Sequence, residues 1–288
     1  MSGGIAQLVA VGAQDAHIVG NPEVSFFRST YKRHTNFAQT VEKQVIQGNP
    51  ATNGMSTVRF ERKGDMLGHV YITNRSSPTN STRVQWKNQI KKIELLIGGQ
   101  VIDTQTSEFS QEIVPVMLSQ TYSKSLAAAA ADKSAVYPLR FSFCENAQSA
   151  LPLIALQYHD VEIRISWNAV SATDYEVHAQ FVYLDTDERT ALSSAPQNML
   201  ITQTQQSIAS DNTLQELNYN HPIKFIAAHK AAGAAVGMAA GNVKLQINGT
   251  DVGDAKKANP HYTSTTLYYH TPFSTLDSSV ATHFMYPF

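Results

Sequence analysis

Apolar and polar residues alternate with a period of two along most of the chain. In DVEIRISW (160–167), Val161, Ile163, Ile165 and Trp167 share one face, and polar residues share the other. This alternation is typical of half-buried strands. STVRFER, HVYITN and AQFVYLD show the same pattern. Many short alternating strands, separated by Gly, Asn and Pro turns, predict an antiparallel sandwich or barrel.

Two hairpins are readable from the same alternation. In KKIELLIGG, positions 93, 95 and 97 are expected on one face and positions 92, 94 and 96 on the other, before a turn at Gly98-Gly99. In NVKLQINGTDV, positions 243, 245 and 247 alternate with polar ones before Asn248-Gly249. Gly-Gly allows the first chain segment to turn back, and Asn-Gly is a strong signal for a type I′ turn. We therefore expect a hairpin at each place.

Three segments break the alternation. Residues 106–133 carry helix formers and a run of alanines, which predicts a helical excursion with a kink near Pro115. Residues 227–241 are small and Gly-spaced, and we expect a mobile loop there. Residues 184–198, LDTDERTALSSAPQN, end a strand with clustered charges and a Ser/Pro/Asn stretch, which predicts a connection between two β units.

The composition limits the kinds of partner that this chain is expected to bind. The chain has 288 residues and only 16% charged residues, against about 25% in a typical soluble domain. This low charge content favours large contacts between subunits. The net charge of −1 argues against sequence-specific or wrapping contact with nucleic acid, because phosphate neutralisation by Lys and Arg supplies much of that affinity. The N-terminal IAQLVAVGAQDAHIVG is expected to form a short amphipathic helix or arm, docked on a protein surface, with a membrane surface as the alternative.

Residues with catalytic or metal-binding chemistry are sparse. Cys144 is the one cysteine, which excludes an internal disulfide and a cysteine zinc site, and it is expected to be a buried small hydrophobe. The histidines show no metal-binding spacing; His159 and His178 lie beside predicted strands and are expected at a rim or in a satisfied core. We therefore predict no catalytic residue, no cofactor and no metal.

The strongest competing site is FVYLDTDERT. Asp185 and Asp187 after an apolar strand resemble a phosphatase-type pair, with a nucleophile and an acid/base. That fold alternates parallel strands with long helices, whereas this region predicts antiparallel strands. We expect a charged corner in which Arg189 pairs with Asp185 or Asp187.

A basic and aromatic stretch and three sequons leave alternatives open. Residues 31–34 (Tyr-Lys-Arg-His) are interleaved with Phe26, Phe27 and Phe37, a mixture that can stack single-stranded nucleic acid. The rest of the chain supplies no basic groove. Among the sequons, Asn74 and Asn80 fall in an expected polar loop where glycosylation is feasible, and Asn248 is expected to serve its hairpin turn.

Longer blocks carry a resemblance over nearly the whole chain. GGIAQLVAVGAQDAHIVGNPEVSFFRSTYKRHTNFA, KKIELLIGGQVID, LPLIALQYHDVEIRISW, VYLDTDER, NHPIKF and VKLQINGTD occur in this order. Together they are similar to major capsid proteins of the nucleocytoplasmic large DNA viruses. No single motif is as specific as these ordered blocks.

For the fold, the resemblance implies an all-β chain with two jelly-roll β-sandwiches in tandem, a double jelly roll. Residues 1–22 would form an N-terminal arm, 23–185 the first jelly roll, 186–197 a linker and 198–288 the second. Gly20-Asn21-Pro22 would turn the arm into a first strand anchored by Phe26 and Phe27.

For function, the resemblance implies a structural virion protein and no enzyme. Three copies would form a pseudo-hexagonal homotrimeric capsomer of an icosahedral capsid, assembled in the host cytoplasm. The arm would lie at the inner base, near minor capsid proteins and an internal membrane, with Lys32 and Arg33 contacting a neighbour.

The sequence also departs from this family. The second unit has only about 90 residues, close to the minimum for eight strands. The chain ends at HFMYPF, where family members continue, so we expect a short variant, a cut chain or completion by another chain. A minor capsid paralogue and, in another class, a carbohydrate-binding attachment protein are the alternatives.

Overall fold

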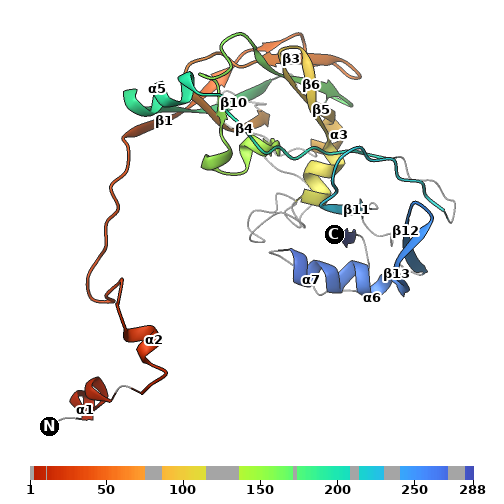
Figure 1. The fold of residues 1–288 in the computed structure, drawn as a ribbon. Coiled ribbons are helices and arrows are strands. Elements are labelled where there is room, and N and C mark those ends of the chain that lie inside the picture. Colours follow the sequence, from red (N-terminus) through yellow and green to blue (C-terminus); the bar gives the residue numbers. More distant parts are fainter. Residues whose placement is uncertain are drawn as a thin grey trace. The chain divides into compact units, whose positions relative to one another are not determined.

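The computed structural model describes residues 3–10, 12–74, 86–114, 136–170, 174–207, 214–229, 241–271 and 283–288. The chain divides into two compact units, residues 1–36 and residues 37–288. The first contains α1 (Gly3–Val9) and α2 (Ala16–Val19), followed by residues without helix or strand up to Asn36. Strands begin only in the second unit (Figure 1).

Two five-stranded antiparallel sheets form the first part of the second unit. One sheet has the order β1-β10-β4-β7, with β8 also paired to β4, and the other has the order β2-β3-β9-β5-β6. Their strands are β1 (Phe37–Gln44), β2 (Ile46–Gln47), β3 (Met55–Arg59), β4 (Met66–Asn74), β5 (Ile90–Ile97), β6 (Gln100–Thr106), β7 (Val136–Pro138), β8 (Leu151–Pro152), β9 (Val161–Trp167) and β10 (Tyr175–Leu184).

One hydrophobic core joins these sheets into a sandwich. Every second residue of β9 is buried, from Val161 to Trp167, as the alternation predicted. These residues share a cluster with Val177 and Phe181 of β10 in the other sheet. A buried hydrogen bond also lies inside the sandwich, where Trp167 Nε1 donates to Ser56 Oγ at 2.9 Å. Two layers around one core are the stable way to bury one face of each sheet.

Short helices lie in the connections between the strands of the sandwich. They are α3 (Trp86–Gln89), the π-helix η1 (Phe109–Ile113), and the 3₁₀ turns η3 (Ser142–Cys144) and η4 (Ala147–Ser149). The turn η1 agrees with the start of the predicted excursion at 106–133, whose residues 115–133 lie outside the described part of the chain.

A nine-residue helix follows the sandwich. α5 (Thr186–Ser194) occupies most of the segment predicted as a linker, 186–197. Asp185 caps it by accepting a hydrogen bond from Thr186 N at 2.7 Å, and Asp187 and Glu188 lie in its first turn, where carboxylates favour helix formation. The charged run is thus a helix start.

The C-terminal region contains two smaller sheets, β11 with β14 and β12 with β13. Its elements are β11 (Phe225–His229), β12 (Asn242–Ile247), β13 (Thr250–Lys257), α6 (Ala258–Pro260), the π-helix η6 (His261–Thr265), α7 (Thr266–His270) and β14 (His283–Pro287). Small clusters such as Ala258, Tyr262 and Phe284 support them.

Two predicted hairpins are confirmed, with one change. Gly98 and Gly99 have φ of +61° and +81°, and Asn248 and Gly249 have φ of +51° and +80°, as type I′ turns require. The change is a bulge in β6: Leu95 pairs with Asp103 and Leu96 with Val101, so Ile102 is the extra residue. In β5, Ile93, Leu95 and Ile97 contribute to the core as predicted, whereas Leu96 is buried but does not belong to that core cluster.

Two predictions are wrong. Ala227, Ala228 and His229 belong to β11 rather than to a loop over 227–241; residues 230–240 lie outside the described part. The alanines pack beside buried Met285 and Phe284, so their small size suits this strand. Asn74 ends β4 and is buried, instead of lying in a polar loop, and a buried side chain cannot carry a glycan. Asn80 is outside the described residues.

Candidate assembly surfaces

The N-terminal segment, residues 3–36, exposes its apolar side chains. All its described residues are exposed, among them Ile5, Leu8, Val9, Ile18, Val19, Val24, Phe26, Phe27 and Tyr31. Phe26 and Phe27 are 98% and 96% exposed and do not anchor a strand, which corrects the expectation that the first strand begins near residue 23. Asn21 does adopt a turn conformation, with φ of +53°. A concentration of exposed apolar side chains marks an interaction surface.

The basic cluster in this segment is also exposed. Lys32 and Arg33 form no ion pair with any residue that the structure describes, whereas the His34 imidazole Nδ1 lies 2.8 Å from Thr35 O. Two cations and a tyrosine that is not buried are therefore available to an anionic partner or to carbonyl oxygens. The cluster lies next to the apolar side chains in the sequence, so one partner could contact both.

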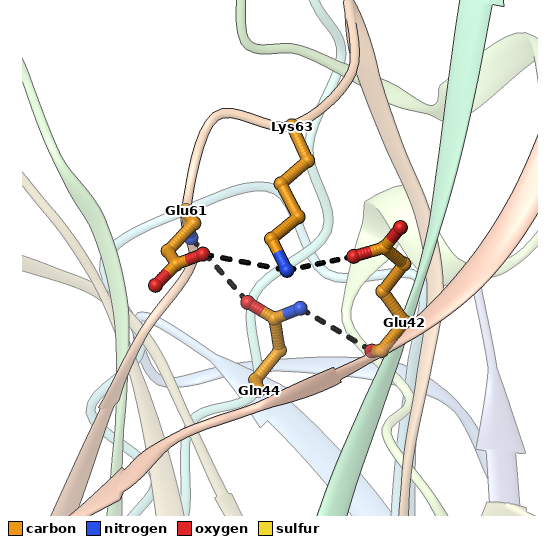
Figure 2. A network of polar contacts seen from close by, with 4 residues as sticks. All are labelled: Glu42, Gln44, Glu61 and Lys63. Carbon is orange, nitrogen blue, oxygen red and sulfur yellow. Dashed lines mark hydrogen bonds and ion pairs between the residues drawn. The ribbon is translucent and has the colours of Figure 1, made fainter.

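A polar network fixes the strand that follows this segment. Lys63 Nζ lies 2.7 Å from Glu42 Oε2 of β1 and 3.4 Å from Glu61 Oε2, as Figure 2 shows. Gln44 accepts from Glu61 N at 3.4 Å and donates to Glu42 O at 3.2 Å. The hydrogen bond to Glu42 is the main cause that raises the pKa of Lys63; burial, the next largest effect, lowers it, and the charge of Glu42 and the contact with Glu61 raise it further. The network connects β1 to the β3–β4 loop.

One surface pocket of the sandwich is lined by arginines that hold a neighbouring loop. This pocket of about 570 Å³ is lined by Arg59, Arg62 and Tyr158, among others. Arg62 donates to the carbonyls of Leu156, Gln157 and His159, the last at 3.0 Å. Arg59 lies 2.6 Å from Asp160 Oδ2. These guanidinium groups hold the loop before β9, so they do not form an anion-binding site.

Asp185 and Asp187, the competing candidates for a phosphatase-type pair, lie at the start of α5. Arg189 binds neither carboxylate; its Nε lies 3.0 Å from Oδ1 of Asp65, which corrects the expected pairing. Asp65 is buried and its Oδ2 accepts from Leu184 N at 2.9 Å. The helix start places Asp185 at its cap, and Asp65 ties α5 to the end of β10.

The other candidates from the sequence are Cys144, His159 and His178, and each contacts parts of the sandwich. Cys144 packs against the sandwich core, and burial raises its pKa to about 12, which keeps the thiol protonated and unreactive. His159 is exposed next to Gly98, where a Cβ would lie 2.6 Å from its ring nitrogen. His178 stacks on Tyr71 at 5.2 Å. Across the described ranges, no three His, Cys, Asp or Glu side chains form a metal-binding group, and no helix is suited to crossing a membrane.

Asp103 is a buried carboxylate that, like Asp65, the sequence did not point to. Asp103 of β6 accepts hydrogen bonds from Thr204 N at 2.8 Å, Gln105 Nε2 at 2.8 Å and Thr104 N at 2.9 Å. Burial raises its pKa, and these hydrogen bonds only partly offset that effect. Gln203 Nε2 also donates to Ile102 O at 2.6 Å. The segment around residue 204 therefore covers part of the open edge of β6. In the sequence, the only signal for the buried position of Asp103 is an Asp within an alternating strand.

Comparisons with known proteins identify the family. The model of the major capsid protein N-terminus matches residues 25–221. The chain belongs to the major capsid protein family of the nucleocytoplasmic large DNA viruses. It is 34% identical to a major capsid protein of Pyramimonas orientalis virus, over 86% of this chain and 71% of that one. For a major capsid protein of Paramecium bursaria Chlorella virus 1, the values are 29%, 97% and 72%.

Solved structures agree on the fold. A quasi-atomic model of the PBCV-1 virus capsid matches 92% of this chain and 80% of that chain, with a TM-score of 0.70 and 22% identity. The capsid family's role is structural: this chain is a capsid protein, located in the virion, that assembles with itself. In such a protein the functional surfaces are those left exposed for other subunits.

Proposed function

We propose that three copies of this capsid protein form a pseudo-hexagonal capsomer of an icosahedral shell, assembled in the host cytoplasm. Each copy would fold as two tandem jelly rolls within the predicted ranges 23–185 and 198–288, joined by 186–197, with the strands of the first beginning at Phe37. The observation that carries this proposal is the fold likeness to the PBCV-1 capsid model over 92% of the chain. Two similar sandwiches in one chain would let three subunits present six lateral faces.

The oligomeric state of the full chain tests this proposal. Light scattering coupled to size exclusion, in native buffer over a range of protein concentrations, should give the mass of three chains. Monomer alone at every concentration would contradict it. Electron microscopy of the same fractions should show particles with a six-lobed outline.

We also propose that residues 1–36 make the contacts at the capsomer's inner base, with minor capsid proteins and near an internal membrane. The exposed Phe26 and Phe27 and the cations Lys32 and Arg33 support this role. Buried aromatic anchors and desolvated charge pairs dominate many interfaces. The contact would therefore combine apolar burial with pairing to carboxylates or carbonyls.

Paired variants of the full chain test this role. Phe26→Ser with Phe27→Ser should weaken assembly, while Tyr158→Ser, at another exposed aromatic position, should not. Lys32→Glu with Arg33→Glu should also weaken it, with Lys91→Glu on the exposed face of β5 as the matched control. If both double variants assemble like the wild type at physiological salt, the segment makes no assembly contact. Flotation with liposomes would separate membrane from protein contacts.

A minor capsid paralogue remains the second candidate. The chain also matches mimivirus proteins named capsid protein 1, probable capsid protein 4 and probable capsid protein 3, so one virus carries several relatives. Copy number in purified virions distinguishes the roles. Hundreds to thousands of copies per particle favour the major shell protein, and a few tens favour a minor component.

A further inference from the structure

Strands β11 and β14 bring two histidines together in the C-terminal region. His229 and His283 are direct partners in the antiparallel register. Their imidazole centroids are 4.7 Å apart, with the ring planes inclined by 46°. Both residues are half-buried, so their rings are held by the strands and still reachable from solvent. They come from positions far apart in the sequence, so only the folded sheet creates the pair.

The ring separation matches that of two ligands of one metal ion. A Zn–N bond of about 2.0–2.1 Å places the ion about 3.2 Å from each imidazole centroid. Two rings that subtend about 90–110° at the ion then have centroids about 4.5–5.2 Å apart. The observed 4.7 Å lies within this interval. Rotation about the N–metal bond changes the inclination of the planes without changing the coordination.

We propose that His229 and His283 bind a divalent transition-metal ion of the class that prefers imidazole, namely Zn²⁺, Ni²⁺ or Cu²⁺. The protein supplies two nitrogen ligands, and water fills the remaining positions. The ion joins β11 to β14 and so closes the chain between residues 229 and 283. Among the described residues these strands pair only with each other, and an isolated two-stranded sheet is marginally stable. The metal fastens this sheet.

Metal titrations of the full chain test the site. Calorimetry and thermal unfolding with zinc, nickel or copper chloride should reveal a site that raises the unfolding midpoint, whereas magnesium, which prefers oxygen ligands, should not. His229→Asn or His283→Asn should lower the affinity at least tenfold. His69→Asn, at an exposed histidine on β4, should leave it unchanged. Wild-type affinity in the His229→Asn, His283→Asn double variant would overturn the proposal.

The wild-type protein gives a second test that needs no variant. Both imidazoles must lose their protons to bind the ion, and an ordinary histidine pKa is about 6.5. Below that pH, the affinity should fall about a hundredfold per pH unit, since two protons compete with one ion. A fall of only tenfold per unit, or none, would contradict a two-histidine site. This result stands even if the substitutions prevent folding.

Discussion

The N-terminal segment (3–36) and the first sandwich (37–184) both contain many large apolar side chains, but they use them differently. Phe181 of the sandwich is fully buried, whereas Phe26 of the segment is 98% exposed. Burial of apolar area is the main favourable term in folding, so the sandwich stabilises itself with its apolar residues. The apolar residues of the segment are exposed to water, so burying them against another molecule would lower the free energy. Apolar composition therefore serves folding in one region and association in the other.

The sharpest way to break this comparison is to make the same substitution in both regions. Phe181→Ala should lower the free energy of unfolding by about 3–5 kcal/mol, because it removes a buried ring and leaves a cavity. Phe26→Ala should change it by less than about 0.5 kcal/mol, as is usual for surface positions. Urea unfolding of both variants, followed by tryptophan fluorescence, measures the difference. A similar loss in the two variants would mean that the segment packs on the folded subunit.

The ion pair between Asp65 and Arg189 allows the same comparison between a buried and an exposed side chain. Asp65→Ala should cost about 1–3 kcal/mol, because it leaves Leu184 N without its acceptor and removes a buried carboxylate. Arg189→Ala should cost only roughly 0–1 kcal/mol, since the arginine side chain is largely exposed and screened by solvent. The two unfolding midpoints, measured at one pH and salt concentration, test this asymmetry. Equal losses would show that the ion pair, rather than the backbone contact, stabilises this corner.

Asp103 predicts a pH dependence. Its pKa is raised in the folded protein, so its contribution to stability is fully present below the unfolded value of about 3.9 and is lost as the pH rises through the folded value. Asp103→Asn cannot ionise, but it places an amide against Gln105 Nε2 and loses one hydrogen bond, a constant cost of about 1 kcal/mol. The variant should therefore be less stable than the wild type at low pH, and the gap should narrow as the pH rises.

Urea unfolding of both proteins from pH 3 to 7 measures this gap. Other titrating groups affect both proteins alike, so their contributions cancel in the difference. A gap that stays constant or widens with pH would contradict the direction of the pKa shift. Thr204→Val, which leaves the backbone N–H donor of residue 204 in place, is a control that should preserve the pH profile.

Local patterns predicted the local parts of this structure. The alternation in β9 and the turn at Asn248-Gly249 were confirmed because both depend on neighbouring residues. The bulge at Ile102 of β6 was missed, since the extra residue shows only in the pairing with β5. The partners of Asp65 and Asp103 were also missed, because they lie about a hundred residues away in the sequence.

The start of the first strand illustrates the same limit for the candidate site. Phe26 and Phe27 have strong strand propensity, but strand β1 begins at Phe37, where pairing with β10 becomes available. Propensity cannot distinguish an aromatic pair that packs inside the subunit from one exposed for a partner. The family resemblance supplied the functional assignment, and the structure located the exposed residues that could carry it.

The smallest effect is expected within the first sandwich, in the Lys63 network beside β1. Lys63→Met removes the contacts to Glu42 and Glu61 but leaves the hydrogen bonds of Gln44 in place. Exposed ion pairs contribute little and are screened by salt, so the unfolding midpoint should fall only slightly, and less in 1 M sodium chloride than at low salt. Gln44→Ala, which empties a buried position, should cost more at both salt concentrations. If Lys63→Met were the more damaging variant, charge rather than buried hydrogen bonding would hold β1 at the edge of its sheet.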